Sequence, residues 1–346
     1  MPVTDFCHGF LIDKRFGDGD RFYVNPPSGI RMRVPNAVLK TVIFLGEDSA
    51  EGIAYKATGY LVSVPGGSEL GKVDSMKHLA ETIPYPTTFM VTARHVAQNL
   101  EGKKFYVRAN KLNGETAIIE FGPETNWWYH PHEKQYVDSA AIPFWPHDSA
   151  QLDIAVIPLR MFVDEQIINN HRIEVGDEVF ITGLFTRTAE TTRNIPIVRI
   201  GTVAMIPGEK LPFKDGLIEA HLIECRSIGG LSGSPVFVRE TLEIQSGVQV
   251  NFGKLHNNIS DSCHSQSFDA EVFYGVGRFY FFGSTVGHWD VKNFSAVQAE
   301  AVNMGISAVV PASKIKEIIL QEGTVELMKA RCKEIEGTRE AQPTYD

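Results

Sequence analysis

The 346-residue sequence has few cysteines and no long apolar run. Cys7, Cys225, Cys263 and Cys332 are scattered and form no CxxC pair, so we expect free thiols in a reducing compartment. No stretch of about 18 apolar residues is present, which argues against a membrane-spanning helix. The first 20 residues lack the apolar core of a secretory signal. Together these absences predict a cytoplasmic protein that does not work at a membrane.

Basic residues are also in the minority. The chain has 33 Lys and Arg against 42 Asp and Glu, for a formal net charge of −9. A surface that binds nucleic acid needs positive charge, so we do not expect a nucleic-acid partner. Neither a complete GxxxxGK[ST] phosphate loop nor a GxGxxG fingerprint occurs, and we expect no cofactor.

What the sequence does contain is many short segments of β-branched and aromatic residues, separated by Gly, Pro and Asn. Examples are residues 38–45, 87–92 and 178–182. Strands of this length with turn residues between them are typical of barrels and sandwiches. We expect an irregular leader, a first β domain, a linker, a second β domain and C-terminal helices with a tail, over residues 1–36, 37–160, 161–175, 176–311 and 312–346 respectively.

The second β domain carries a long polar insertion at residues 240–272. A segment of that length inside a β fold is commonly a functional surface loop. It would cover a cleft, gate access to it or bind a regulatory partner. After it, residues 313–320 and 325–332 repeat apolar side chains at helical spacing, which predicts two amphipathic helices.

The most informative short motif is Ser-Ile-Gly-Gly-Leu-Ser-Gly-Ser-Pro-Val at residues 227–236. Small neighbours leave the Ser232 hydroxyl accessible, and Gly230 can adopt backbone conformations closed to other residues. The N–H groups of Gly230 and Ser232 would then converge as an oxyanion hole, the main electrostatic element of acyl transfer. Alone, such a cluster is a weak signal, because Gly and Ser clusters usually form turns.

A histidine and two aspartates complete a possible set. His95 follows the β-rich segment Phe-Met-Val-Thr-Ala at residues 89–93, and an imidazole is the usual base for a serine hydroxyl. Asp138 and Asp153 each stand at the entry to an apolar segment. A buried carboxylate beside an imidazole would fix its tautomer, and the residue pattern alone leaves both aspartates open.

In this order, V-T-A-x-H, D-x-A-x-[IL] and G-x-S-G-S-P resemble the trypsin-like serine peptidases of the chymotrypsin fold. Residues 175–185 and 193–199 are similar to an uncharacterised bacterial group of these peptidases, and residues 305–311 are similar to the closing strand of the high-temperature-requirement proteases. The resemblance covers about residues 38–320. It implies an all-β fold of two six-stranded antiparallel barrels with C-terminal helices, His95 and the aspartate on the first barrel and Ser232 on the second.

The resemblance also implies roles. His95 falls on the general base, Ser232 on the nucleophile, and Gly230 and Ser232 on the oxyanion hole. We favour Asp138 as the triad carboxylate, because a tryptophan and a His-Pro precede it as they do in the resembling group. Asp153 is the alternative, since a cleaner apolar strand follows it.

Two departures from the family pattern affect activation and specificity. Leu231 stands where zymogen-activated trypsins have an aspartate, so we expect no activation by N-terminal cleavage. Arg226 stands near the position that selects basic side chains in trypsin, which disfavours a basic residue before the cleaved bond. We expect the substrate strand to pair with Ser284, Thr285, Val286 and Gly287.

The sequence thus predicts a serine endopeptidase that acts on polypeptides. The alternative is a catalytically silent, protease-shaped binding module. A zinc site around His130, His132 and His147 is disfavoured, because the H-x-H pair lacks a third ligand at a recognisable spacing, and we expect no metal.

Overall fold

The structure is a computed structural model that describes residues 34–72, 74–145, 151–185, 193–213, 216–225, 230–240, 279–292 and 301–340. Three sequence-based expectations therefore lie largely or wholly outside the described residues: the leader, Arg226 and the insertion after Glu240.

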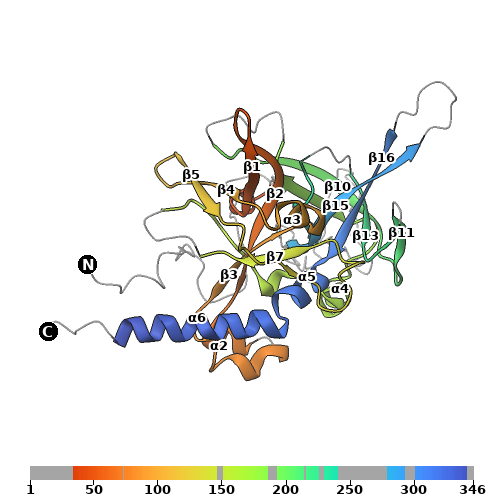
Figure 1. Ribbon diagram of the computed structural model, residues 1–346. Helices are drawn as coiled ribbons and strands as arrows, with labels where there is room; N and C mark the ends of the chain where they lie inside the picture. Colours follow the sequence, from red (N-terminus) through yellow and green to blue (C-terminus); the bar gives the residue numbers. More distant parts are fainter. Residues whose placement is uncertain are drawn as a thin grey trace, which may run out of the picture.

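The N-terminal half forms an eight-stranded sheet in the order β5-β4-β1-β2-β3-β7-β6, with β8 paired in parallel to β2 (Figure 1). Its strands are β1 (Val42–Ser49), β2 (Gly52–Val64), β3 (Thr87–Thr92), β4 (Phe105–Asn110), β5 (Thr116–Phe121), β6 (Trp128–Tyr129), β7 (Ala140–Pro143) and β8 (Ile157–Pro158).

All six residues of β3 are buried, because both faces of this strand are covered. Successive side chains of a strand point to opposite faces. Met90 accordingly packs into the core of the N-terminal sheet, whereas Phe89 and Val91 pack into the core shared with the C-terminal half. β3 is therefore a firm support for the histidine that follows it.

The C-terminal half closes into a six-stranded barrel in the order β10-β13-β16-β15-β14-β9. Its strands are β9 (Glu178–Gly183), β10 (Ile197–Met205), β13 (His221–Glu224), β14 (Pro235–Arg239), β15 (Phe279–Lys292) and β16 (Ala301–Pro311), and a separate hairpin is made of β11 (Leu211–Phe213) and β12 (Gly216–Ile218). The expected mostly-β fold and a six-stranded barrel are thus present.

The expectation of a second closed barrel is not met by the described residues. Residues 151–156 form no strand of this sheet. Leu152 makes an isolated antiparallel bridge to Lys111, and Ala155 N–H donates a single hydrogen bond to the Lys40 carbonyl. Only Ile157–Pro158 joins the sheet as a short strand. The strands at the two edges of the sheet, β5 and β6, are not paired with each other.

Helices occupy the connections and the C-terminus. They are α1 (Asn36–Leu39), α2 (Gly67–Gly71), η1 (Asp74–Leu79), α3 (Arg94–Leu100), η3 (Leu159–Met161), α4 (Glu165–His171), α5 (Ala312–Ile319) and α6 (Glu322–Glu340). Figure 1 shows α6 running beside α2 below the sheet. None of the helices in the described part of the chain is long and apolar enough to cross a membrane.

The apolar side of α5 seals the core. Ile315, Ile318 and Ile319 are fully buried in the cluster that both halves share.

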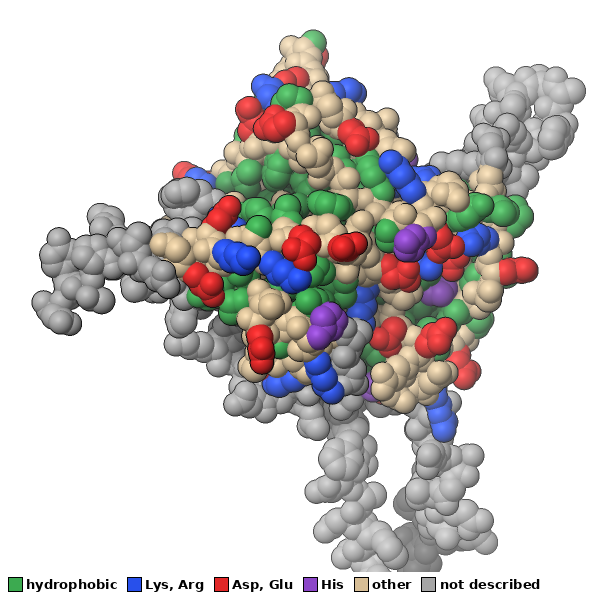
Figure 2. Space-filling view, turned by 60° about the horizontal axis from the view of Figure 1, so that its bottom comes forward, with side chains coloured by type: hydrophobic (Ala, Val, Ile, Leu, Met, Phe, Trp, Pro, Cys, Tyr) green, Lys and Arg blue, Asp and Glu red, His purple; other side chains and the backbone are tan. Residues whose placement is uncertain are grey.

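Acidic and basic side chains are interspersed on the face shown in Figure 2, with apolar side chains between them.

Candidate active site

His95 is fixed by two hydrogen bonds to one carboxylate. β3 ends at Thr92, Ala93 remains extended, and α3 begins at Arg94. The His95 backbone N–H donates to Asp138 Oδ1 over 2.9 Å, and the ring Nδ1 lies 2.7 Å from Asp138 Oδ2. Because each carboxylate oxygen serves a different atom of the same residue, both the side chain and its helix turn are held.

Asp138 sits in a buried position just before β7, with 6% of its surface exposed. Burial by itself would raise the pKa of this carboxyl. The hydrogen bonds and charge of His95, together with the charge of Arg94, outweigh burial and hold the pKa of Asp138 below its ordinary value. An ionised Asp138 accepts the Nδ1 proton of His95, which leaves Nε2 of a neutral ring as the basic atom.

Asp153 lies elsewhere. Its Oδ1 is 2.6 Å from Nζ of Lys40, in a partly exposed ion pair. The structure therefore brings Asp138 to His95 and places Asp153 on Lys40.

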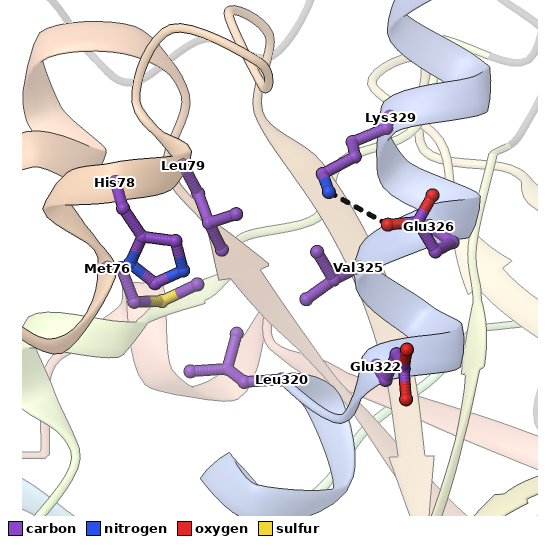
Figure 3. Close-up of a pocket in the computed structure, with 8 residues that line it drawn as sticks. All are labelled: Met76, His78, Leu79, Leu320, Glu322, Val325, Glu326 and Lys329. Carbon is purple, nitrogen blue, oxygen red and sulfur yellow. Dashed lines mark hydrogen bonds and ion pairs between the residues drawn. The ribbon is translucent and has the colours of Figure 1, made fainter.

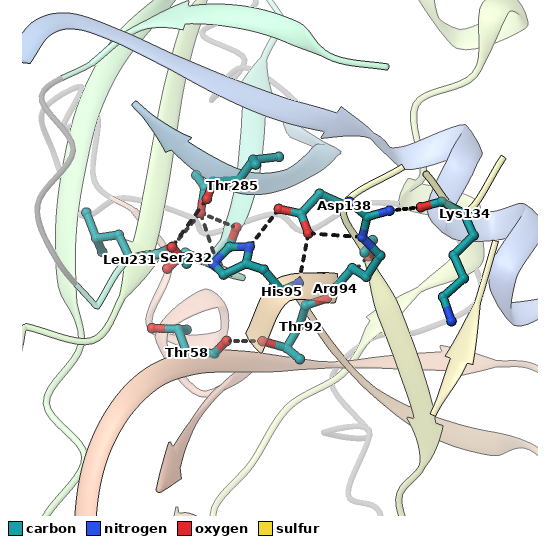
Figure 4. Close-up of polar contacts among 12 residues, drawn as sticks. Thr58, Thr92, Arg94, His95, Lys134, Asp138, Leu231, Ser232 and Thr285 are labelled. Carbon is teal, nitrogen blue, oxygen red and sulfur yellow. Dashed lines mark hydrogen bonds and ion pairs between the residues drawn. The ribbon is translucent and has the colours of Figure 1, made fainter. Parts of the chain in front are cut away.

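Ser232 stands in the loop that leads into β14, and Figure 4 shows the His95 ring between it and Asp138. The hydroxyl donates to the Val286 carbonyl over 3.3 Å. Within the described ranges, no hydrogen bond joins Ser232 to His95. The hydroxyl would have to turn about its Cα–Cβ bond to give its proton to the imidazole.

Thr58, on β2 of the N-terminal sheet, holds the loop that carries Ser232 (the serine loop). The sequence analysis did not single out this residue. Its Oγ1 donates to the Gly230 carbonyl over 2.8 Å, and its N–H donates to the Ser232 carbonyl over 3.4 Å. The Thr92 hydroxyl bonds the Thr58 carbonyl over 2.8 Å (Figure 4). One threonine thus ties the segment before His95 to the segment around Ser232, and no local pattern signals it.

The segment expected to pair with a substrate, residues 284–287, is partly used for contacts inside the protein. Ser284 and Thr285 are buried, and Thr285 Oγ1 donates to the Leu231 carbonyl and accepts from Ser234 N–H over 3.1 Å. Val286 falls at a bulge in the pairing of β15 with β16, and its side chain is also buried. Any contact to a substrate from this segment would therefore come from backbone groups at Val286 and Gly287.

The structure describes both residues whose N–H groups are expected to form an oxyanion hole, Gly230 and Ser232. Neither Gly230 N–H nor Ser232 N–H has a hydrogen-bond acceptor among the described residues. Gly230 has a φ of 94°, a conformation that favours glycine.

His130, considered above as a metal ligand, is a buried structural residue. Its Nε2 lies 2.8 Å from Oε2 of Glu317, and its Nδ1 accepts from Glu133 N–H over 3.0 Å. No three His, Cys, Asp or Glu side chains gather at one point among the residues that the structure describes.

A cavity of about 520 Å³ lies between η1 and the start of α6 (Figure 3). Its eight lining residues do not include His95, Asp138 or Ser232. Two of them, Glu326 and Lys329, pair with each other over 2.8 Å. The cavity is therefore separate from the candidate active site.

No protein-family model matches the chain, and no curated protein does. Among solved structures, it is similar to the MamO protease domain from Magnetospirillum magneticum in its apo form, with 14% identity over 83% of this chain and 98% of that chain and a TM-score of 0.43. It is also similar to an inactive mutant form of Rv3671c from M. tuberculosis, with 12% identity over 84% and 90% of the two chains and a TM-score of 0.38. Likenesses this distant do not say what this chain does.

Proposed function

We propose that this protein is a serine endopeptidase of the trypsin-like kind, with His95, Asp138 and Ser232 as its triad. The observation that carries the proposal is the two-point hydrogen bonding of Asp138 to the ring and backbone of His95. A surface histidine has no need of a buried, ionised carboxylate on Nδ1, whereas a general base that must become an imidazolium does.

The reaction would begin when Ser232 turns from Val286 toward His95. Nε2 of His95 takes the hydroxyl proton as Ser232 Oγ attacks the peptide carbonyl, and Asp138 stabilises the imidazolium. The N–H groups of Gly230 and Ser232 would bind the oxyanion. His95 then protonates the leaving amine, and water hydrolyses the acyl-enzyme with His95 again as base.

The second candidate is a protease-shaped binding module without catalysis. The bond from Ser232 to the Val286 carbonyl favours it, because that bond directs the hydroxyl away from His95. The ionised Asp138 on His95 favours the enzyme, and we therefore place the enzyme first.

The experiment that tests the peptidase is a digestion of a mixed peptide library, with new chain ends read by mass spectrometry. We expect the wild-type protein to generate ends that the Ser232→Ala protein does not. The same profile gives the residue preference before the cleaved bond. Identical digests from both proteins would contradict the proposal and favour the binding module.

A further inference from the structure

Arg94, the residue before His95, reaches the same carboxylate from the other side. Its Nε lies 3.8 Å from Asp138 Oδ1, the oxygen that also accepts the His95 backbone N–H. One of its terminal nitrogens, Nη1, donates to the Lys134 carbonyl (Figure 4). The Nε atom is buried and has no hydrogen-bond partner among the described residues. The guanidinium thus bridges a backbone carbonyl and the triad carboxylate.

The Lys134 carbonyl is a fixed point, because Glu133 beside it is anchored twice. The Glu133 carboxylate lies 2.8 Å from Nζ of Lys210, before β11, and 2.7 Å from Nζ of Lys314 on α5. Hydrogen bonds from these two lysines lower the pKa of Glu133 to about 2. The carboxylate therefore keeps its charge, and the loop that leads to Asp138 is tied to both the second half and the C-terminal helix.

The charge of Arg94 adds to the hydrogen bonds that orient the Asp138 carboxylate. Among the described residues, Oδ1 accepts from the His95 backbone N–H and Oδ2 lies against the imidazole. Rotation of the carboxylate about its Cβ–Cγ bond would weaken both at once. The positive charge near Oδ1 opposes that rotation, and at this depth a charge interaction is screened less than at the surface.

We propose that Arg94 is a positioning residue that holds the Asp138 carboxylate so that Oδ2 faces Nδ1 of His95. Its importance for catalysis rests on the proposed peptidase function, but its effect on the hydrogen bond does not. Arg94 touches no reacting atom and acts through Asp138.

The test is the proton NMR signal of His95 Nδ1–H, which lies far downfield when it is bonded to a carboxylate and is assigned by its loss in His95→Gln. We expect the wild-type protein to show this proton and Arg94→Met to show it broadened, with about tenfold faster exchange with water. Arg94→Lys should restore part of the protection, because it keeps the charge. In the peptide assay Arg94→Met should lower kcat about 10- to 100-fold and change KM little.

Arg239→Met is the matched control. Arg239 is a mostly buried arginine of the barrel that pairs with Glu178 over 2.5 Å. Its loss should lower the melting temperature without changing the His95 proton. If Arg94→Met does not fold, Arg94→Gln removes the charge while still able to donate to the Lys134 carbonyl, and the same reading applies.

The proposal would be overturned if the His95 Nδ1–H proton of Arg94→Met or Arg94→Gln exchanged with water as slowly as that of the wild type. It would also be overturned if the wild-type protein showed no such signal. If the signal behaves as expected but no variant, wild type included, cleaves peptides, the peptidase function fails and the role of Arg94 in orienting Asp138 stands.

Discussion

Asp138→Asn is expected to lower kcat/KM by about 10⁴-fold. The reason is the tautomer of His95. The carboxylate accepts the Nδ1 proton over 2.7 Å, whereas the amide of asparagine can present a donor to the same nitrogen. His95 would then carry its proton on Nε2 and could not take one from Ser232. The His95 N–H bond to the side-chain oxygen can persist, so we expect the fold to survive. Steady-state kinetics on a peptide chosen from the library digest provide the measurement.

Asp153→Asn is the matched control, because the two aspartates have the same local sequence pattern. It removes the partly exposed ion pair with Lys40, which is worth about 0.5 kcal/mol. Turnover should stay within about twofold of wild type, since a pair of this kind contributes little even to stability. A large loss in Asp153→Asn with normal turnover in Asp138→Asn would reverse our assignment of the triad.

Gly233→Ala is expected to disorganise the site. Gly233 has a φ of 78°, and a Cβ on it would lie 2.5 Å from the Thr58 carbonyl oxygen and 2.8 Å from the Ala93 nitrogen, as well as against the Thr92 hydroxyl. Two of these neighbours are backbone atoms, so the clash cannot be relieved by a side-chain rotation. The loop must move away from the segment that carries His95. We expect kcat/KM to fall by about 100-fold or more, because small misplacements of reacting groups are costly.

Gly102→Ala separates the clash from backbone strain. Gly102 has a φ of 71°, close to that of Gly233, but a Cβ there meets no atom within 4 Å. Alanine at this position should cost about 1 to 2 kcal/mol of stability, read by thermal unfolding, and leave turnover unchanged. Equal activity of the two variants would contradict the close approach of the serine loop to the histidine segment.

Much of the strand content could be predicted from the sequence, because it depends on local side-chain pattern. The residues expected as strands at 87–92 and 178–182 lie in β3 and β9. Barrel closure could not be predicted, since it depends on whether distant edge strands of the sheet pair. The apolar alternation of residues 151–156 also predicts a strand, yet their backbone makes only an isolated bridge and single bonds to the sheet.

The residues of the candidate site also differ in whether the sequence predicts them. His95, Ser232 and Gly230 stand in short motifs whose residue types carry the chemistry. Thr58 stands in no such motif, and Arg94 occupies the variable position of V-T-A-x-H. Thr58 bonds a carbonyl 172 residues away, and Arg94 meets a carboxylate contributed by a different loop. Such contacts arise only when distant segments are brought together, and an arginine or a threonine alone predicts none of them.

Covalent labelling by a fluorophosphonate probe tests most directly whether Ser232 is an activated nucleophile. The probe reacts with an activated serine whatever the substrate. The intact mass of the wild-type and Ser232→Ala proteins, followed by peptide mapping, reads the result. We predict labelling of the wild-type protein at Ser232 and none of Ser232→Ala. An unlabelled wild-type protein, or equal labelling of both, would contradict the claim.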